Sequence, residues 1–379
     1  MPRPVLTVDA LCGPGALAAV AGDWCELAAA RAPGPFYRWY GWWKCCVAIL
    51  EPDPGAVTFF VVRQDSRPLA IVPLRLETDG GAGLGAQVWR LPRHPHVPLA
   101  DLPCVEDADA DELLAALLPA LALHAGRAWD ALVLEPIPAQ SPLSRIGAVP
   151  GTRHCRTTVK TCEEIPTCAR VEDHQSRLSA NFRSNLRKAR NKLLREPAVE
   201  FGSARQPGEI DAALDEFVQL EASGWKGRAG TAIAQDVRLR AFYRGLAREL
   251  GPQGRVVVNT LRVAGRLIAG QFCLQGDDTL YVLKLAYDET WSRVAPGNML
   301  LEHLVLNGGA DGIHRINLVG NPQWLRDWQP ASQDVHCHWV TNGSLRGRAL
   351  AGLLDARRRL RPFVRRVLGR DAAGRGSRR

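Results

Sequence analysis

The sequence has no Cys-x-x-Cys pair and no long apolar run, and each absence excludes a class of protein. Its ten cysteines are scattered, and several stand among apolar neighbours as Cys273 does, so we expect reduced, buried thiols. The most apolar stretch, 113–125, is too short to cross a bilayer, and we expect a packed core helix there. Residues 1–15 lack the continuous apolar region of a secretory signal, which favours a cytoplasmic protein.

Acidic residues are scarce at the C-terminal end, and this scarcity explains the basic charge of the whole chain. The 379 residues carry a net charge of +9, but residues 344–379 hold 12 arginines against Asp355 and Asp371. That segment alone contributes +10, so the remainder is close to neutral. The basic charge therefore describes an appendage and does not indicate that the whole protein binds nucleic acid.

One order of segments occurs twice along the chain. Two β-rich runs joined by a polar turn are followed by a third strand, an apolar helix and a short strand. The first copy lies at 57–63, 69–76, 86–91, 111–125 and 131–135, and the second at 255–263, 267–274, 279–285, 298–309 and 315–319. A fixed order that recurs once is the signature of a duplicated domain. We therefore expect an α/β (α+β) fold of two tandem halves, each a mixed, mostly antiparallel sheet flanked by helices.

A basic helix is expected between the halves, at 177–195. Apolar residues recur there at the spacing of one helical face, while seven Lys and Arg residues occur without an acid among them. Two more helices are expected at 211–223 and 236–250. We expect a first half at 1–165, a second at 166–343 that includes the basic helix, and an Arg-rich helical tail at 344–379 with a disordered end.

Four segments resemble the CelD/BcsL-type acetyltransferases: Phe182-Arg-Ser-Asn-Leu-Arg-Lys-Ala-Arg, Gly224-Trp-Lys-Gly-Arg-Ala-Gly-Thr-Ala-Ile, Lys284-Leu-Ala-Tyr-Asp-Glu and Ala295-Pro-Gly-Asn-Met-Leu. They occur in family order, and the resemblance covers residues 36–339. The family belongs to the GNAT-like N-acyltransferases and is related in fold to the FemABX aminoacyl transferases, which consist of two GNAT-like halves. The resemblance implies an acyl-CoA donor, acetyl-CoA above others, an amine acceptor that is a small molecule or a saccharide, and a setting in envelope or exopolysaccharide metabolism.

Two departures from the family pattern bear on the acceptor and the donor. Asn317 stands where the family tends to have an acid, and Trp324-Leu325 stands where it has a Tyr-Lys pair. If those polar groups bind the family's acceptor, the acceptor of this chain differs. Arg293-Val-Ala-Pro-Gly-Asn keeps the Arg and a Gly of the GNAT acyl-CoA loop but not its spacing, so CoA is implied by the resemblance alone.

Three residues in and just after the third strand of the second half are candidates for proton transfer. Asp288 and its competitor Glu289 lie close to a helix start, where either could instead cap the turn. Lys284 projects from the preceding strand, and simple alternation places it on one face with Val282 and Ala286. A lysine among apolar residues lies at a sheet edge or points into a cleft, and we expect the cleft.

Binding residues are expected on both sides of these candidates. Pro296-Gly297-Asn298 opens a helix whose free N–H groups and dipole favour a pyrophosphate, and Arg293 could contact the same anion; the alternatives are an ordinary helix start and a solvated arginine. The substrate-binding candidates are Trp225, Lys226 and Arg228 in a glycine-flanked loop, together with Asn317 and Trp328. A packed tryptophan with solvated neighbours is the alternative for the loop.

No metal is expected, because His336-Cys-His338 has no second ligand pair at a recognised spacing. The glycine-rich run 80–86 precedes a strand and so predicts a hairpin turn, not a dinucleotide loop.

Two rival functions stay open. One is a FemABX-like transferase that uses aminoacyl-tRNA, and the basic helix favours this function. The other is a catalytically silent module docked through the tail, whose leucines and arginines suit an anionic membrane at the inner face; a helix packed on the domain is the alternative for the tail.

Overall fold

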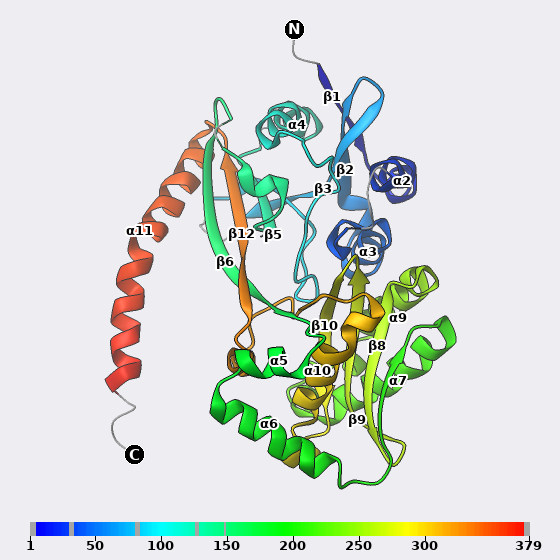
Figure 1. Cartoon of the computed structure of the whole chain (residues 1–379). Coiled ribbons are helices and arrows are strands. Elements are labelled where there is room, and N and C mark those ends of the chain that lie inside the picture. The colour runs from blue at the N-terminus through cyan, green and yellow to red at the C-terminus, as the bar shows by residue number, and fades with distance from the viewer. Residues whose placement is uncertain (1–4, 30–33, 80–83, 126–128, 148, 375–379) are drawn as a thin grey trace.

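The computed structural model describes residues 5–29, 34–79, 84–125, 129–147 and 149–374. Within these ranges the strands form one sheet of 12 strands in the order β1-β2-β3-β4-β5-β12-β6-β11-β10-β9-β8-β7. Helices cover both of its faces (Figure 1). The strands are β1 (Leu6–Leu11), β2 (Val57–Gln64), β3 (Arg67–Asp79), β4 (Ala86–Arg90), β5 (Ala131–Pro138), β6 (Arg153–Pro166), β7 (Val199–Ala204), β8 (Val256–Val263), β9 (Arg266–Gly276), β10 (Thr279–Tyr287), β11 (Arg315–Asn317) and β12 (Ala331–Thr341).

The duplicated order of elements is confirmed. The first half contains α1 (Ala16–Ala19), α2 (Ala21–Ala29), α3 (Tyr40–Cys45) and α4 (Ala110–His124); the second contains α5 (Val171–Arg177), α6 (Ala180–Leu193), α7 (Pro207–Ser223), α8 (Trp225–Arg228), α9 (Val237–Leu250) and α10 (Pro296–Asn307). In each half two antiparallel pairs are followed by a helix and a strand that pairs in parallel, β4 with β5 and β10 with β11. The predicted fold class, a mixed and mostly antiparallel sheet flanked by helices, is therefore correct.

The two halves exchange their last strands at the centre of the sheet. β6 follows β5 in sequence but pairs with β11 of the second half, and β12 follows β11 but pairs with β5 of the first half. β6 and β12 also pair with each other, antiparallel, along the whole of β12. The boundary expected at residue 165 falls at the end of β6, so strands from both sides of it are interleaved.

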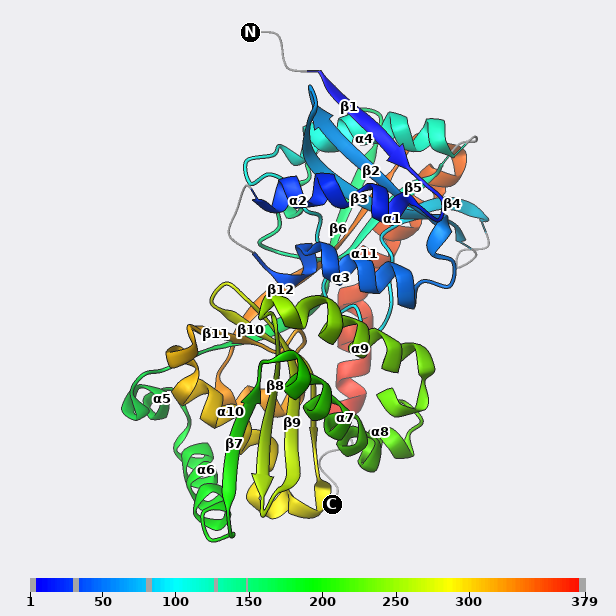
Figure 2. The same cartoon turned by 90° about the vertical axis from the view of Figure 1, so that its right-hand side faces the viewer.

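The helices of the second half cover both faces of β7–β10 (Figure 2). One core contains the apolar sides of α7 and α9 and continues into the first half, where the rings of Trp42 and Phe242 meet edge to face at 5.7 Å. A separate core on the other face contains α6 and α10. The predicted basic helix is confirmed as α6: its apolar side is buried, and Ser179 caps its first turn with a hydrogen bond to the Phe182 N–H.

The last helix, α11 (Leu345–Gly374), starts against the sheet and then extends away from it (Figure 1). Leu350 packs near its start in a small core with residues of β4, β5 and β12. Among the described residues, no helix is long and apolar enough to cross a membrane. Residues 80–83 of the expected glycine-rich turn and the chain end at 375–379 lie outside the described residues.

A β-bulge interrupts β10 at Leu283. In the pairing with β9, Val282 and Lys284 are opposite consecutive residues, so Leu283 has no partner in the ladder. One extra residue reverses the side-chain alternation that follows it. The expectation that Val282, Lys284 and Ala286 share one face is therefore wrong: Val282 packs in the core with α10, whereas Leu283 and Ala286 pack in the core with α7.

Candidate functional site

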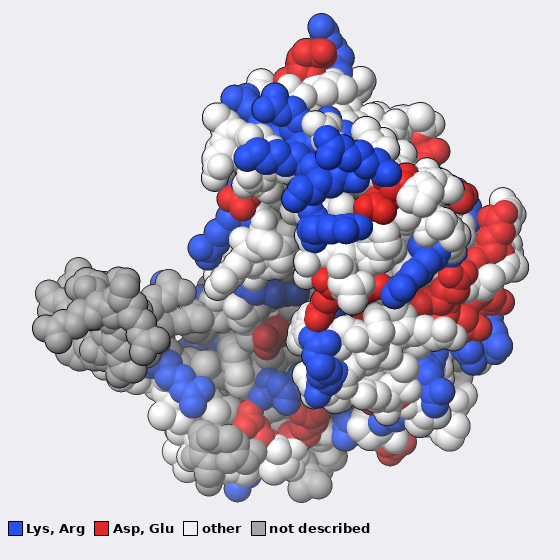
Figure 3. Space-filling model, turned by 90° about the horizontal axis from the view of Figure 1, so that it is seen from below, with Lys and Arg blue, Asp and Glu red and all other residues white. Residues whose placement is uncertain are grey.

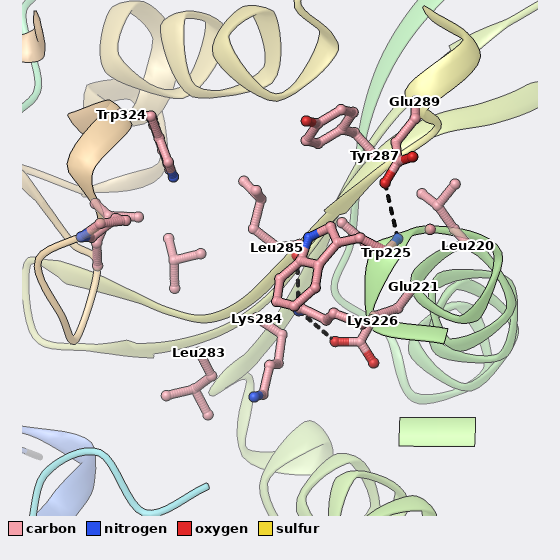
Figure 4. A pocket seen from close by; sticks show the side chains of 15 residues that line it. Leu220, Glu221, Trp225, Lys226, Leu283, Lys284, Leu285, Tyr287, Glu289 and Trp324 are labelled. Carbon is pink, nitrogen blue, oxygen red and sulfur yellow. Dashed lines mark hydrogen bonds and ion pairs between the residues drawn. The ribbon is translucent and has the colours of Figure 1, made fainter. Parts of the chain in front are cut away.

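A cavity of about 440 Å³ opens where β10 and β11 diverge. The two strands pair over only three residues each, up to Tyr281 and Asn317, because β11 ends there. The continuation of β10 then forms one wall, the start of α8 a second, and the segment around Trp324 a third (Figure 4). We call this the Lys284 cavity. Its lining comprises Leu220, Glu221, Gly224, Trp225, Lys226, Val282–Tyr287, Glu289, Leu318, Pro322 and Trp324.

Lys284 is the half-buried cation of this cavity, as expected of a lysine that points into a cleft. In the described part of the chain its ammonium makes no hydrogen bond and no ion pair. Burial, together with the nearby charge of Lys226, lowers the pKa of Lys284 to about 8. A lysine with such a pKa is partly neutral near pH 8 and can accept a proton there.

Lys226 is fixed beside Lys284 by a buried carboxylate. Its ammonium lies 2.6 Å from Oε1 of Glu221, and it donates a longer hydrogen bond of 3.4 Å to the Leu285 carbonyl (Figure 4). The second oxygen of Glu221 accepts the Ile233 N–H at 2.9 Å. The Glu221 side chain is only 2% exposed, so this pair is held in one geometry.

A second cavity, of about 260 Å³, lies at the N-terminus of α10. It is lined by Pro296, Gly297 and Asn298 of the first turn, and it shares Leu285, Tyr287 and Trp324 with the Lys284 cavity. Free N–H groups at a helix start, with the helix dipole, favour an anion. A Cβ added at Gly297 would lie 3.7 Å from the Tyr287 ring, so the backbone is open to the cavity. We call this the α10 cavity.

The two expected acids are engaged in the loop that joins β10 to α10. Asp288 accepts hydrogen bonds from the Thr290 N–H and hydroxyl, and it pairs with Arg266 at 2.5 Å. Glu289 accepts the Trp225 N–H at 2.9 Å and pairs with Arg228 at 2.7 Å. Burial raises the pKa of Asp288, but the hydrogen bonds from Thr290 and the charge of Arg266 outweigh it and hold that pKa below its usual range.

The remaining predicted residues are divided among three places. Arg293 pairs with Glu196 at 2.6 Å and lies over the Trp291 ring, outside the lining of both cavities. Trp328 is buried in the α6–α10 core and donates a hydrogen bond of 3.3 Å to the Asn298 side chain. Asn317 lines a third cavity, between the two halves. Trp225, Lys226 and Lys284 are thus brought together with Glu289 in one cavity, and Gly297 lies in the adjoining one.

Two residues of the lining, Glu221 and Trp324, were not among the predicted site residues. Glu221 continues the apolar face of α7, and an acid on an apolar helical face was a signal that could have identified it. Trp324 forms the wall common to both cavities, but its position depends on the path of the chain after β11, for which the sequence has no local signal. As for metals, no group of three or more His, Cys, Asp or Glu residues in the described ranges is arranged to hold an ion.

Residues 180–329 match the family described as an acetyltransferase (GNAT) domain. No curated protein is significantly similar to the chain in sequence. Among solved structures, a conserved protein of unknown function from Bacteroides thetaiotaomicron VPI-5482 superposes with a TM-score of 0.54 at 14% identity, over 85% of this chain and 97% of that one. FemX superposes with a TM-score of 0.55 at 10% identity, over 84% of this chain and 94% of FemX. Both likenesses establish the shared fold.

The matched segment runs from the first residue of α6 to just beyond Trp328. It therefore includes every residue that lines the Lys284 cavity and the α10 cavity. Both cavities therefore lie in the segment that matches the GNAT acetyltransferase domain.

Proposed function

We propose that the protein is an acyl-CoA-dependent N-acyltransferase that transfers an acyl group, with acetyl as the first candidate, to a primary amine. The observation that carries the proposal is the connection between the two cavities. The α10 cavity offers a helix start to a pyrophosphate, the Lys284 cavity offers an amine of lowered pKa, and the wall of Leu285, Tyr287 and Trp324 is common to both. A donor with an anionic end and a reactive thioester at the other would extend along this wall.

The donor would be held by the backbone more than by charged side chains. Arg293 is already paired with Glu196, so the N–H groups after Pro296 are the principal donors to the pyrophosphate. The apolar and aromatic side chains of the shared wall would pack against the arm that carries the acyl group. We assign the backbone N–H of Leu283, the residue without a partner in the ladder with β9, to the thioester oxygen as negative charge develops on it.

The reaction then needs a free amine and a place for its proton. A neutral Lys284 would take the proton from the acceptor, whose nitrogen attacks the thioester carbonyl. The C–N bond forms, the C–S bond breaks, and the departing thiolate of CoA receives a proton. We assign Asp288 and Glu289 to positioning, because each already holds the loop that carries Trp225 or the start of α10 in place.

Gly297 supplies the direct test. Isothermal titration with acetyl-CoA and longer acyl-CoAs, paired with a transfer assay on a primary amine, should reveal saturable binding to the wild type. Gly297→Trp should abolish it by filling the α10 cavity. Gly297→Ala is the matched control, since its Cβ would make ordinary contacts and affinity should change by less than about tenfold. Equal affinity of the Trp variant and the wild type would exclude the α10 cavity as the donor site.

An alternative donor is an aminoacyl-tRNA, and the basic surface of α6 is the observation that favours it. Arg183, Arg187 and Lys188 are exposed on this helix, and α6 lies at the lower end of the molecule. Viewed from below, Lys and Arg side chains gather in one area (Figure 3). Retention of tRNA at low salt that acetyl-CoA fails to displace, with no acyl-CoA binding, would favour this donor. A catalytically silent module would bind neither tRNA nor acyl-CoA.

The wider setting is proposed from the sequence resemblance. We place the protein in the cytoplasm, with the first half at 1–165, the transferase half at 166–343 and the tail at 344–379. The tail would hold it at the inner face of an anionic membrane, in envelope or exopolysaccharide metabolism, where the amine acceptor is a small molecule or a saccharide. The arginines of the tail supply the positive charge that this attachment needs.

A further inference from the structure

A third cavity, of about 180 Å³, lies where the two halves meet, over the central strands of the sheet. Strands of both halves line it, and so does the segment around Tyr37. We call it the junction cavity. Its lining consists of Pro35, Tyr37, Leu99, Pro138, Gln140, Cys162, Glu164, Gly276, Asp277, Thr279, Tyr281, Arg315, Asn317, Gln333, Asp334 and Val335.

Three of these side chains lie in one row across the sheet. Tyr281 of β10 is directly opposite Asn317 of β11, and Asn317 is directly opposite Glu164 of β6. Residues opposite one another on neighbouring strands lie on the same face of a sheet. The row thus presents an aromatic ring, an amide and a carboxylate side by side, with the Asn317 amide donating to Glu164 over 3.5 Å.

More acidic than basic side chains line the junction cavity. Glu164, Asp277 and Asp334 line it, and within the described residues none of the three makes an ion pair. The single cation of the lining, Arg315, is already paired with Asp278 at 2.6 Å. Carboxylates that are not paired within the protein favour a cation from outside.

A tyrosine hydroxyl at the wall of this cavity provides a second, independent indication of a ligand. Tyr37 is 8% exposed and lines the cavity, and its hydroxyl makes no hydrogen bond to any described residue. At the wall of a cavity, such a hydroxyl can donate a hydrogen bond to a bound polar group or accept one from it. The rings of Tyr37 and Tyr281 lie 6.2 Å apart and offer aromatic faces that attract an organic cation.

The junction cavity and the Lys284 cavity lie along the same side of β10. Tyr281 lines the first and Leu283 the second, and both pack on the side of the sheet that includes α7. A segment of the first half follows this side: Leu99 lines the junction cavity, and His96 lies close enough to Lys284 for their charges to interact. Lys284 is three positions after Tyr281, a distance of ~10 Å along a strand.

We propose that the junction cavity binds a second cationic group of the acceptor, so that the substrate is an amine with another ammonium or guanidinium about 10 Å from the nitrogen that is acylated. Glu164 and Asp334 would neutralise this group, and the rings of Tyr37 and Tyr281 would pack against it. This inference rests on the proposed transferase function, and it assigns to the first half of the chain a part in substrate selection.

The test compares linear α,ω-diamines of increasing length with monoamines of matched length, each as acceptor for acetyl-CoA and each as a ligand in calorimetry. Diamines that span about 10 Å should have a KM at least tenfold below that of the matched monoamine. Glu164→Gln should remove this advantage while leaving the KM for the monoamine and for acetyl-CoA unchanged. Glu163→Gln, on the neighbouring residue of β6 that lies outside the cavity lining, is the control and should behave as wild type.

Each outcome separates the inference from the proposed function. Transfer to monoamines and diamines with equal KM, or a Glu164→Gln variant that keeps the preference, would overturn the acceptor subsite and leave the transferase function standing. Diamine binding in calorimetry that Glu164→Gln abolishes, without any acyl transfer, would support the subsite and overturn the transferase function. Equal diamine binding by wild type and Glu164→Gln would overturn the subsite whatever the activity.

Discussion

The ammonium group of Lys226 lies 2.6 Å from a carboxylate oxygen of Glu221, a side chain that is 2% exposed. This ion pair stands beside Lys284, whose ammonium has no such partner in the described part of the chain. One lysine of the cavity is thus held by a buried acid, while the other has no such partner and has a pKa of about 8. The predictions for proton transfer follow from this difference.

Lys284→Met should reduce the rate of acyl transfer by about 10²- to 10⁴-fold, the usual contribution of a general base, without loss of folding. The wild-type rate should rise with pH and level off above about 8, because only the neutral amine accepts a proton. Steady-state kinetics between pH 6 and 10, beside circular dichroism, provide the measurement. Lys188→Met removes a cation from exposed α6 and is the control. A rate that falls as the pH rises through 8 would instead indicate that Lys284 acts as a cation.

The neighbours of Lys284 should move its pKa in opposite directions. Lys226→Met removes a positive charge that lowers this pKa, so the midpoint of the pH–rate profile should move upward. Glu221→Gln removes a negative charge that raises it, and the midpoint should move downward. The pH–rate profiles of wild type and both variants should be measured with the same acceptor amine, so that the titration of the acceptor contributes equally to all three. Two shifts of the same sign would contradict the electrostatic assignment.

Arg190→Met should lower the free energy of unfolding by about 3 kcal/mol, because it leaves the buried carboxylate of Glu302 without its main cation. The double variant Arg190→Met/Glu302→Gln should regain much of this loss. Burial raises the pKa of Glu302, but the nearby His174 ring, at 3.6 Å, and the hydrogen bonds from Arg190 outweigh it and hold that pKa below normal. The stabilisation is therefore present above the unfolded pKa of about 4.3 and is lost as pH falls through the lower pKa of the folded protein. The free energies of unfolding of wild type and Arg190→Met, measured by urea titration, should therefore become equal in acid. A difference in unfolding free energy that stays constant down to pH 3 would contradict a role for the Glu302 carboxylate.

Removal of residues 361–379 should release the protein from anionic vesicles. This segment carries seven arginines against one acid, and the truncation spares Leu350, which packs on the sheet. Sedimentation with phosphatidylglycerol vesicles at low salt should retain the full chain and not the truncated one, and high salt should release the full chain. Phosphatidylcholine vesicles are the control. Equal retention of the two proteins would exclude this segment of the tail as the attachment site.

Local patterns in the sequence were sufficient for the elements of the repeated order and for the basic helix, but not for β1, β6, β7 and β12. The apolar face of α6 and the repeated strand order both rest on residues close together in sequence, and both are confirmed. The bulge at Leu283 could not be predicted this way, because a one-residue insertion leaves the composition of a strand unchanged while reversing its faces. The exchange of β6 and β12 was also missed, since either pairing satisfies the same strand pattern.

The candidate site was predictable only where it rests on contiguous residues. Lys284 and Trp225-Lys226 lie in segments that the resemblance identified, and the structure brings them into one cavity. Glu221 and Trp324 reach the same cavity from α7 and from the chain beyond β11, which depends on how distant segments pack. The junction cavity, with Tyr37 and Glu164 from the first half, is a product of tertiary assembly and has no counterpart in any local motif.

The exchange of the two central strands also sets the order in which the chain can fold during synthesis. β5 ends at Pro138, but the strand that covers its edge, β12, is made only at Ala331–Thr341. Until then the nascent first half carries an open strand edge, the kind that invites pairing with other chains. The ribosome therefore releases no finished half along the way, and a stop codon or a strong pause before β12 should yield aggregates in place of a functional fragment.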